Sequence, residues 1–122
     1  MNYTKIQQGD VLLLKVSEDV FEENKDTRSR TKFHNERAVL AEGEGTGHAH
    51  AIYMEDLLDG AEVILCNDGD YDRQNRGIIV TGKPVELRHE EHNTITLEPG
   101  FYLQRIVKEY DHISGITRRV AD

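Results

Sequence analysis

The chain has 122 residues, which is the length of one ordinary domain, so we expect a single domain over residues 1–122. Its 15 basic and 23 acidic residues give a formal net charge of −8. An acidic surface repels phosphate groups, so nucleic acid is not an expected partner. No apolar run approaches the roughly 20 residues that span a bilayer, and the first residues lack the pattern of a signal peptide. Because the lone cysteine, Cys66, forms no internal disulfide, we expect a cytoplasmic protein without a membrane partner.

Short runs of β-branched and aliphatic residues, broken by glycine, proline, asparagine and aspartate, predict strands along most of the chain. The predicted strands cover residues 11–16, 38–42, 48–54, 62–66, 78–81, 84–89, 94–97 and 101–108. About seven short strands at this spacing predict an all-β fold, either a small sandwich or a small barrel. An α+β fold is the alternative, because the segments 55–60 and 109–122 are both compatible with helices.

Residues 17–37 form a polar stretch that interrupts the predicted strands. The stretch holds six acidic and five basic residues, and its only large apolar residues are Val20, Phe21 and Phe33. Such a segment buries little apolar surface, whereas ordering its backbone costs about 1–2 kcal/mol per residue. We therefore predict a charged, mobile loop or a hairpin extension, with a short helix over 18–25 as the alternative.

Four of the six histidines occur in two compact pairs, and these pairs are the most informative feature of the chain. In the first pair, His48 and His50 are two residues apart within a predicted strand. Side chains two apart leave the same face of a strand, about 6.6 Å apart along the backbone. The flanking alanines and glycine leave space for a third group, so this pair can present two nitrogen atoms to one metal ion.

The second pair consists of His89 and His92, which are separated by Glu90 and Glu91. On an uninterrupted strand, residues three apart point to opposite faces. If the two glutamates are the loop of a tight hairpin, the two histidines become cross-strand neighbours. Two glutamates are poor residues for such a turn, so a longer loop or a bulge is an equal alternative. Each geometry leaves His89, together with His92 or Glu91, as a ligand candidate.

The two pairs together predict a shared site for a divalent transition metal. The candidate ligands are His48, His50, His89 and His92. The candidates for groups that support these ligands by hydrogen bonds are Glu44, Thr46, Glu90 and Glu91. Zinc suits such a site, and iron or manganese suits it where a carboxylate and an open position are present. A hydrogen-bonded histidine cluster without metal, and unrelated surface positions, are the alternatives.

The glycine-rich segment 43–47 directly precedes the first histidine pair. It lacks the Gly-Lys-Ser/Thr spacing of a phosphate-binding loop, so we expect no nucleotide cofactor. It is either an ordinary hairpin loop or a loop that lines the site around His48. The remaining histidines, His34 and His112, stand apart from both pairs.

Two families resemble parts of this sequence. His48-x-His50 followed by Glu55 is similar to the first motif of cupins, in which two histidines and a glutamate bind a metal ion inside a β-barrel. The segment 97–100 resembles the Pro-Gly turn of the second cupin motif. Cupins place their last histidine after that turn, whereas here the second histidine pair precedes it. This resemblance covers the middle of the chain and implies a metal-binding β-barrel.

The second resemblance rests on segments 43–50 and 89–102. Their motifs are Gly-Glu-x-Thr-Gly-His-x-His and His-Glu-Glu-His-x-x-Ile-x-Leu-x-Pro-Gly-x-Tyr, and Glu-Tyr-Asp follows at 109–111. They look like the motifs of a group of short prokaryotic proteins to which no activity is attached. The resemblance therefore implies a family but no function.

Two functions of different classes are consistent with these features. The first is a small metal-binding β-domain, whose site is structural if four histidines bind and able to activate water if three bind. The second is a non-enzymatic interaction or assembly module, for example of a phage or mobile-element system. Residues 17–37 would then be the docking arm for a protein partner or a second copy of the chain. Whether the protein is an enzyme stays open.

Overall fold

The computed structural model describes most of the chain. The described residues are 3–24, 30–33, 36–42, 48–66, 76–111 and 116–119. Within them, strands dominate, and the only helices are α1 (Glu18–Asn24) and the single 3-10 turn η1 (Met54–Asp56). The all-β prediction is therefore confirmed. In this part of the chain no helix has both the length and the apolar character to cross a membrane.

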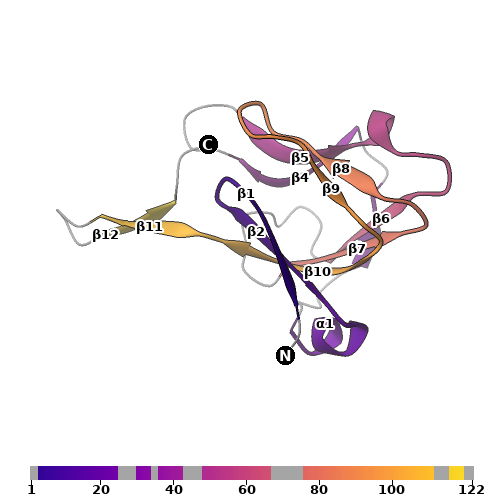
Figure 1. Ribbon diagram of the computed structural model, residues 1–122, viewed down its shortest axis with the longest axis horizontal. Coiled ribbons are helices and arrows are strands. Elements are labelled where there is room, and N and C mark those ends of the chain that lie inside the picture. The colour runs from indigo at the N-terminus through magenta and orange to yellow at the C-terminus, as the bar shows by residue number, and fades with distance from the viewer. Residues whose placement is uncertain are drawn as a thin grey trace.

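A six-stranded antiparallel sheet forms the body of the molecule (Figure 1). In spatial order its strands are β1 (Thr4–Gln8), β2 (Val11–Val16), β10 (Gly100–Ile106), β7 (Arg76–Thr81), β6 (Glu62–Cys66) and β3 (Arg30–Lys32). The central strand β7 is buried along almost its whole length, which fits its run of aliphatic residues. The edge strand β1 is mostly exposed, which fits its polar sequence.

Three further pairs of strands are hydrogen bonded as antiparallel hairpins. They are β4 (Arg37–Glu42) with β5 (Ala49–Tyr53), β8 (Val85–Leu87) with β9 (Ile95–Leu97), and β11 (Lys108–Asp111) with β12 (Ile116–Arg119). The β11–β12 hairpin continues the direction of β10 away from the body (Figure 1). The α+β alternative is thus wrong: residues 109–119 contain strands instead of a helix, and the segment 55–60 contributes only part of η1.

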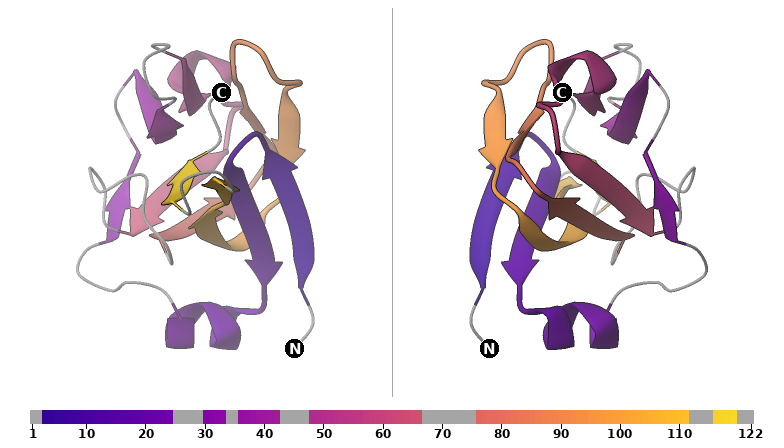
Figure 2. Two further views of the ribbon diagram at one scale, coloured as in Figure 1. Left: turned by 90° about the vertical axis from the view of Figure 1, so that its left-hand side faces the viewer. Right: turned by 90° about the vertical axis from the view of Figure 1, so that its right-hand side faces the viewer.

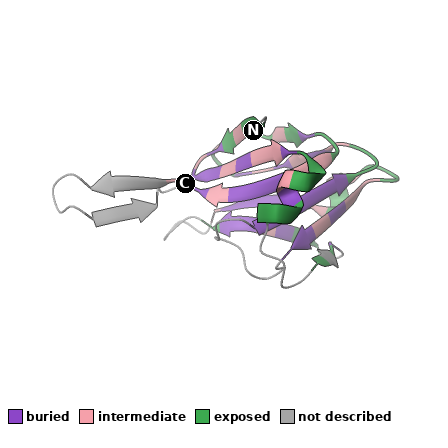
Figure 3. Cartoon of the chain, turned by 90° about the horizontal axis from the view of Figure 1, so that it is seen from below, coloured by how far each residue is buried: buried purple, intermediate pink, exposed green. Residues whose placement is uncertain are grey.

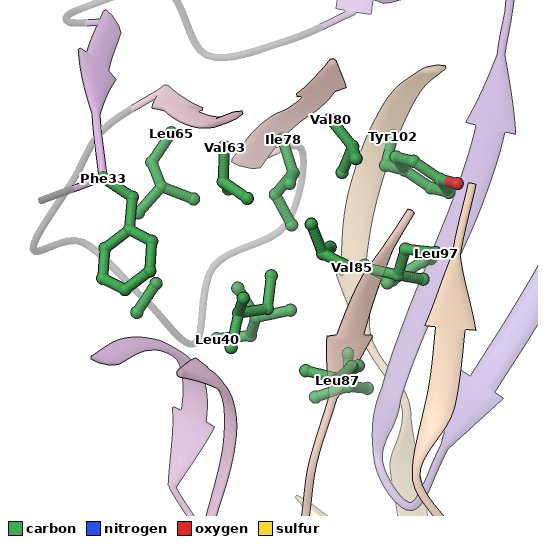
Figure 4. Packing of buried hydrophobic residues seen from close by; sticks show 14 of the residues in the cluster. Phe33, Leu40, Val63, Leu65, Ile78, Val80, Val85, Leu87, Leu97 and Tyr102 are labelled. Carbon is green, nitrogen blue, oxygen red and sulfur yellow. The ribbon is translucent and has the colours of Figure 1, made fainter. Parts of the chain in front are cut away.

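The main hydrophobic core lies between one face of the large sheet and the hairpins β4–β5 and β8–β9 (Figure 4). The sheet contributes Ile78 and Tyr102, and the hairpins contribute Leu40 and Leu87, all fully buried. Each such side chain contributes roughly 1.5–3 kcal/mol through removal of apolar surface from water. This packing holds the two hairpins, which carry both histidine pairs, against one sheet.

The opposite face of the sheet is covered by α1 (Figure 3). Phe21 is the buried residue of this helix, and its ring lies 5.2 Å from that of Phe101. The stretch 17–37, for which the sequence predicts a loop or a short helix, thus contains α1 and the edge strand β3 among its described residues. Figure 2 shows α1 and η1 at opposite ends of the molecule, so α1 lies far from the end that carries β5.

Two buried polar side chains of the large sheet fasten the β4–β5 hairpin to it. Arg76 Nη1 donates a hydrogen bond to the carbonyl oxygen of Val39 (2.9 Å), and Gln104 Nε2 donates one to that of Leu40 (2.7 Å). Both carbonyls lie at the irregularity in the β4–β5 register between Val39 and Ala41. The carbonyl groups at this β-bulge therefore have hydrogen-bond partners in the interior. These bonds fix β4 against the large sheet, and β4 in turn fixes its partner strand β5.

Candidate metal centre

One β-bridge brings the two histidine pairs together. The N–H of Ala51 on β5 donates to the carbonyl oxygen of Arg88 (2.9 Å), and the N–H of Arg88 donates to that of Ala51 (2.8 Å). In an antiparallel pair, residues one step from a bridge in opposite chain directions face each other. His50 and His89 are therefore cross-strand neighbours, although 38 residues separate them in the chain.

The same register continues outward from the bridge. The N–H of Ala49 donates to Glu90 Oε1 (2.9 Å), and His48 Nδ1 lies 3.7 Å from Glu91 Oε1. His89 to His92 belong to the segment between the end of β8 at Leu87 and the start of β9 at Ile95. The second histidine pair is thus on a longer loop, one of the two geometries that the sequence left open, and not on a two-residue turn.

All four paired histidines form one cluster of rings. The ring of His89 is the centre of the cluster, and its centroid lies 4.3 Å from that of His50, 4.6 Å from His92 and 5.6 Å from His48. The cluster runs from the interior outward, because His50 is completely buried, His89 is 7% exposed and the side chain of His48 is 27% exposed. A ligand from solvent can therefore reach the cluster from the side of His48, and not from the side of His50.

The innermost imidazole is held by two buried polar residues near the β1–β2 turn. His50 Nδ1 lies 2.8 Å from Gln8 Oε1, and His50 Nε2 lies 3.2 Å from Asp10 Oδ1. Gln8 Nε2 donates to the carbonyl oxygens of Leu87 (3.0 Å) and Asn93 (2.9 Å), so its Oε1 is the acceptor and His50 Nδ1 carries a proton. His50 Nε2 faces the buried carboxylate of Asp10 on the other side of the ring. The two ring nitrogens of His50 thus face Gln8 and Asp10, and neither points to the outer side of the cluster.

The central imidazole accepts hydrogen bonds from the backbone of its own loop. His89 Nδ1 accepts from the N–H groups of Glu91 (3.0 Å) and His92 (3.3 Å). The lone pair of a neutral His89 is therefore on Nδ1, and its proton is on Nε2. This arrangement fixes the ring orientation and ties it to the conformation of residues 90–92.

Three residues at the outer side of the cluster have the proximity that a metal ion requires. One ligand atom each of His48, His89 and Glu90 lies within 4.8 Å of the others. The backbone N–H of Ala49, then the backbone N–H of Glu90 itself, and then the charges of His48 and His89, lower the pKa of Glu90 below the usual value of a glutamate. Glu90 is thus ionised at neutral pH, as a metal ligand must be.

A pocket of about 200 Å³ opens beside these residues, and it is lined by Ala49, Tyr53, Arg88, His89 and Glu90. The guanidinium carbon of Arg88 lies 4.0 Å from the centre of the Tyr53 ring. Its Nε lies 2.8 Å from Asp56 Oδ2, and its Nη2 donates to Glu55 Oε1 at 2.9 Å. Glu55 therefore pairs with Arg88 and is not part of the histidine cluster. The resemblance to cupins implied that Glu55 would be a metal ligand, and this position does not fit that role.

Several residues of this centre have no signal in the sequence. Gln8 and Asp10 come from a polar strand end and an ordinary turn, and only the folded chain brings them to His50. Arg88 and Tyr53 are likewise not part of any motif. The predicted supporting residues Glu44 and Thr46 lie outside the described residues, and so do the remaining histidines, His34 and His112.

A family model matches residues 7–107 of this chain, a range that contains the whole histidine cluster together with Gln8 and Asp10. The chain belongs to the family described as Domain of unknown function (DUF8820). No curated protein and no solved structure matches the chain. The similarity to cupins finds no support in these comparisons.

Proposed function

We propose that this protein is a small metal-binding β-domain that holds one divalent transition metal ion through His48, His89 and Glu90. The observation that carries the proposal is the mutual proximity of their ligand atoms, all within 4.8 Å, on the register set by the Ala51–Arg88 bridge. Small movements of these side chains bring such atoms to the roughly 2.0–2.2 Å at which nitrogen and oxygen ligands bind zinc.

The proposed ligands differ from the four histidines that the sequence suggests, because Glu90, predicted there as a supporting residue, takes the place of His50 and His92. His50 is fully buried, and its two ring nitrogens face Gln8 and Asp10, so we assign it a supporting role. Its ring lies 4.3 Å from that of His89 and limits how that ligand can turn. The ring of His92 lies 4.6 Å from that of His89, and we propose it as the candidate fourth donor from the same loop.

Two imidazoles and one carboxylate are a mixed nitrogen and oxygen donor set. Zinc accepts this set, and so do iron(II) and manganese(II) where further positions stay open to water or substrate. Three protein ligands are typical of sites that carry out chemistry, whereas structural zinc sites are closed by four. Because His89 and Glu90 also line the pocket, the open positions of the ion would face it.

Metal binding by His89 requires a local change in the loop. Its Nδ1 lone pair accepts hydrogen bonds from the amides of Glu91 and His92. If Nδ1 binds the ion, these amides must release it. If Nε2 binds the ion, the proton moves to Nδ1 and faces the two amide donors. Both routes rearrange residues 90–92, so binding is coupled to a movement of this loop.

An ion with an open position would lower the pKa of a bound water molecule toward about 7. Glu91 is the candidate proton acceptor, because its Oε1 lies 3.7 Å from His48 Nδ1 and its side chain is 60% exposed. This arrangement supports water activation beside the pocket.

The proposal is tested by titrating Zn²⁺ and Mn²⁺ into metal-stripped protein, with calorimetry and the thermal unfolding midpoint as readouts. Wild-type protein is expected to bind one ion and to unfold at a higher temperature when loaded. His48→Ala and Glu90→Gln change exposed or half-buried residues, so both are expected to fold and to lose most of the affinity. Glu86→Gln is the matched control, because Glu86 is a carboxylate of β8 outside the cluster. Absence of binding in the wild type would refute the proposal.

A second candidate function is interaction with a protein partner or a second copy through residues 17–37. The supporting observation is that β3, within this stretch, is an edge strand of the six-stranded sheet. Edge strands can pair with a strand of another chain. The stretch cannot simply be deleted as a test, because Phe21 and Phe33 are buried in the two cores.

Lys32→Pro tests this second function without a deletion. The N–H of Phe33 donates inward to the carbonyl oxygen of Val63 (2.7 Å), so alternation along the strand directs the N–H of Lys32 to the outer edge. Proline at position 32 therefore removes an outer donor and leaves the β3–β6 pairing in place. If β3 is an interface, light scattering shows a smaller particle for Lys32→Pro than for Lys32→Ala. A wild-type monomer without a partner in pull-down experiments excludes this function.

A further inference from the structure

We infer that the pocket beside the proposed metal site binds a small oxyanion, a carboxylate or a phosphate, with Arg88 as the anchoring cation and the metal ion as its second contact. The inference rests on the proposed function and adds a ligand class to it. It uses the pocket lining, the fixed position of the Arg88 guanidinium and the distribution of charge around it.

The guanidinium of Arg88 is held in one orientation before any ligand arrives. It stacks on the ring of Tyr53 at 4.0 Å, and carboxylates of Asp56 and Glu55 engage its Nε and Nη2. The backbone of Arg88 is also fixed by the bridge to Ala51. A cation restrained in this way loses little conformational entropy when it binds a ligand, which favours recognition.

One nitrogen of this guanidinium is left for a ligand. Among the described residues no acceptor contacts Nη1, whereas Nε and Nη2 both face carboxylates. The usual two-pronged contact between arginine and an oxyanion is therefore closed, and a single oxygen can accept from Nη1. A second oxygen of the same ligand needs another positively charged partner. The ion on His89 and Glu90 would be that partner, because both residues line the same pocket.

The charges make anion binding depend on the metal ion. Arg88 already has two carboxylate partners, and Glu90 adds a third negative charge to the pocket lining. Without a bound cation these groups repel an anion despite the arginine. A divalent ion adds two positive charges at the pocket wall and reverses this balance.

The pocket restricts the size of the ligand. A volume of about 200 Å³ is below the roughly 300–1,000 Å³ of pockets for drug-sized molecules. It is suited to a short carboxylate or a single phosphate group, and both carry oxygens that can bridge an ion and Nη1. The chemistry shared by these two ligands defines the class, and acetate and inorganic phosphate are suitable probes for it.

The experiment follows the visible absorption spectrum of Co²⁺-loaded protein during titration with acetate and, separately, with inorganic phosphate. A ligand that enters the coordination sphere of Co²⁺ changes this spectrum. For the wild type, at least one of the two probes is expected to give a saturable change, and the probe with the higher affinity identifies the class. Arg88→Gln is expected to weaken anion binding at least about tenfold, because it removes a charged hydrogen bond. Its Co²⁺ affinity should stay within about twofold of the wild type, since Arg88 is not a ligand.

Lys32→Gln is the matched control, because Lys32 is an exposed cation paired with Glu62 on a strand that does not line the pocket. It should bind Co²⁺ and both anions as the wild type does, and circular dichroism verifies that both variants are folded. A Co²⁺-loaded wild type that responds to neither anion overturns the inference and leaves the metal site standing. An Arg88→Gln variant with wild-type anion affinity also overturns it. A protein that binds no Co²⁺, Zn²⁺ or Mn²⁺ overturns the proposed function and this inference together, and the metal titration alone identifies that case.

Discussion

His50 and His89 lie directly opposite each other, with ring centroids 4.3 Å apart, because the two hydrogen bonds between Ala51 and Arg88 set the register one residue away. A slip of one residue would move His89 to the other face of its segment and disperse the cluster. The candidate metal centre therefore depends on backbone pairing as much as on its ligands.

Replacement of Gln8 by methionine is expected to destabilise the protein. The change keeps the size of the side chain, but it removes the partner of the buried carbonyl of Leu87, of the buried Nδ1–H of His50 and of the half-buried carbonyl of Asn93. Each buried group left unsatisfied costs about 1–3 kcal/mol, so we expect a loss of about 2–4 kcal/mol in the free energy of unfolding. Urea denaturation measures this loss. Gln7→Met is the control, because Gln7 is exposed on the same strand, and its effect should stay within about 0.5 kcal/mol.

Zinc binding is expected to shift the amide resonances of Glu91 and His92 in nuclear magnetic resonance spectra. Both amides donate to His89 Nδ1, and metal binding by this ring forces them to find other partners. The amides of α1, which lies far from the end of the molecule that carries β5, should change little. If zinc binds and the two amide signals stay in place, His89 is not a ligand in the way we propose.

The sequence predicts the buried part of the fold better than its edges. The strands β2 and β6 have the predicted bounds, because continuous aliphatic runs mark them clearly. The edge strands β1 and β3 have few apolar residues and were not predicted. Their stability comes from pairing with β2 and β6, which no local pattern of residues records.

The candidate site also has one part that local sequence patterns predict and one part that they do not. Local spacing predicts a strand over 48–54 that carries both His48 and His50, and β5 covers Ala49–Tyr53, so His50 is on the strand and His48 directly precedes it. The juxtaposition with His89 follows from a single long-range bridge, and the two buried partners of His50 come from the start of the chain. Long-range pairings of this kind are decided by the whole core and cannot be derived from spacing alone.

Two glycines in facing turns should respond very differently to replacement by alanine. Gly60 (φ +90°) and Gly82 (φ +82°) both have positive φ angles, which cost an alanine about 1–2 kcal/mol. A Cβ atom at Gly60 meets no atom within 4 Å, whereas at Gly82 it would lie 2.0 Å from the carbonyl oxygen of Gly60. Gly60→Ala should therefore lower the free energy of unfolding only by the about 1–2 kcal/mol of the unfavourable φ angle. Gly82→Ala should lower it by about 3 kcal/mol or more, because the Cβ atom also clashes with the backbone. Equal losses in urea denaturation would contradict the close approach of the two turns.

Tyr102 is expected to make the protein less stable at alkaline pH. Its side chain is fully buried and its hydroxyl donates to the carbonyl oxygen of Glu98. Burial, and then the charge of Glu98, raise the pKa of Tyr102 to about 12, whereas a tyrosine in an unfolded chain titrates near 10. A group whose pKa is raised on folding contributes its full stability below the unfolded pKa, and loses it as the pH rises through the folded pKa.

Between pH 10 and 12 the wild type should therefore lose about 2–3 kcal/mol of unfolding free energy that the Tyr102→Phe variant does not lose. The variant is less stable at neutral pH because it lacks the hydrogen bond to Glu98, so the slopes with pH are compared and not the absolute values. Tyr3→Phe is the control, because Tyr3 is 46% exposed and should leave the wild-type slope unchanged. Parallel pH profiles for the wild type and Tyr102→Phe would show that this phenol does not titrate differently in the folded and unfolded chains.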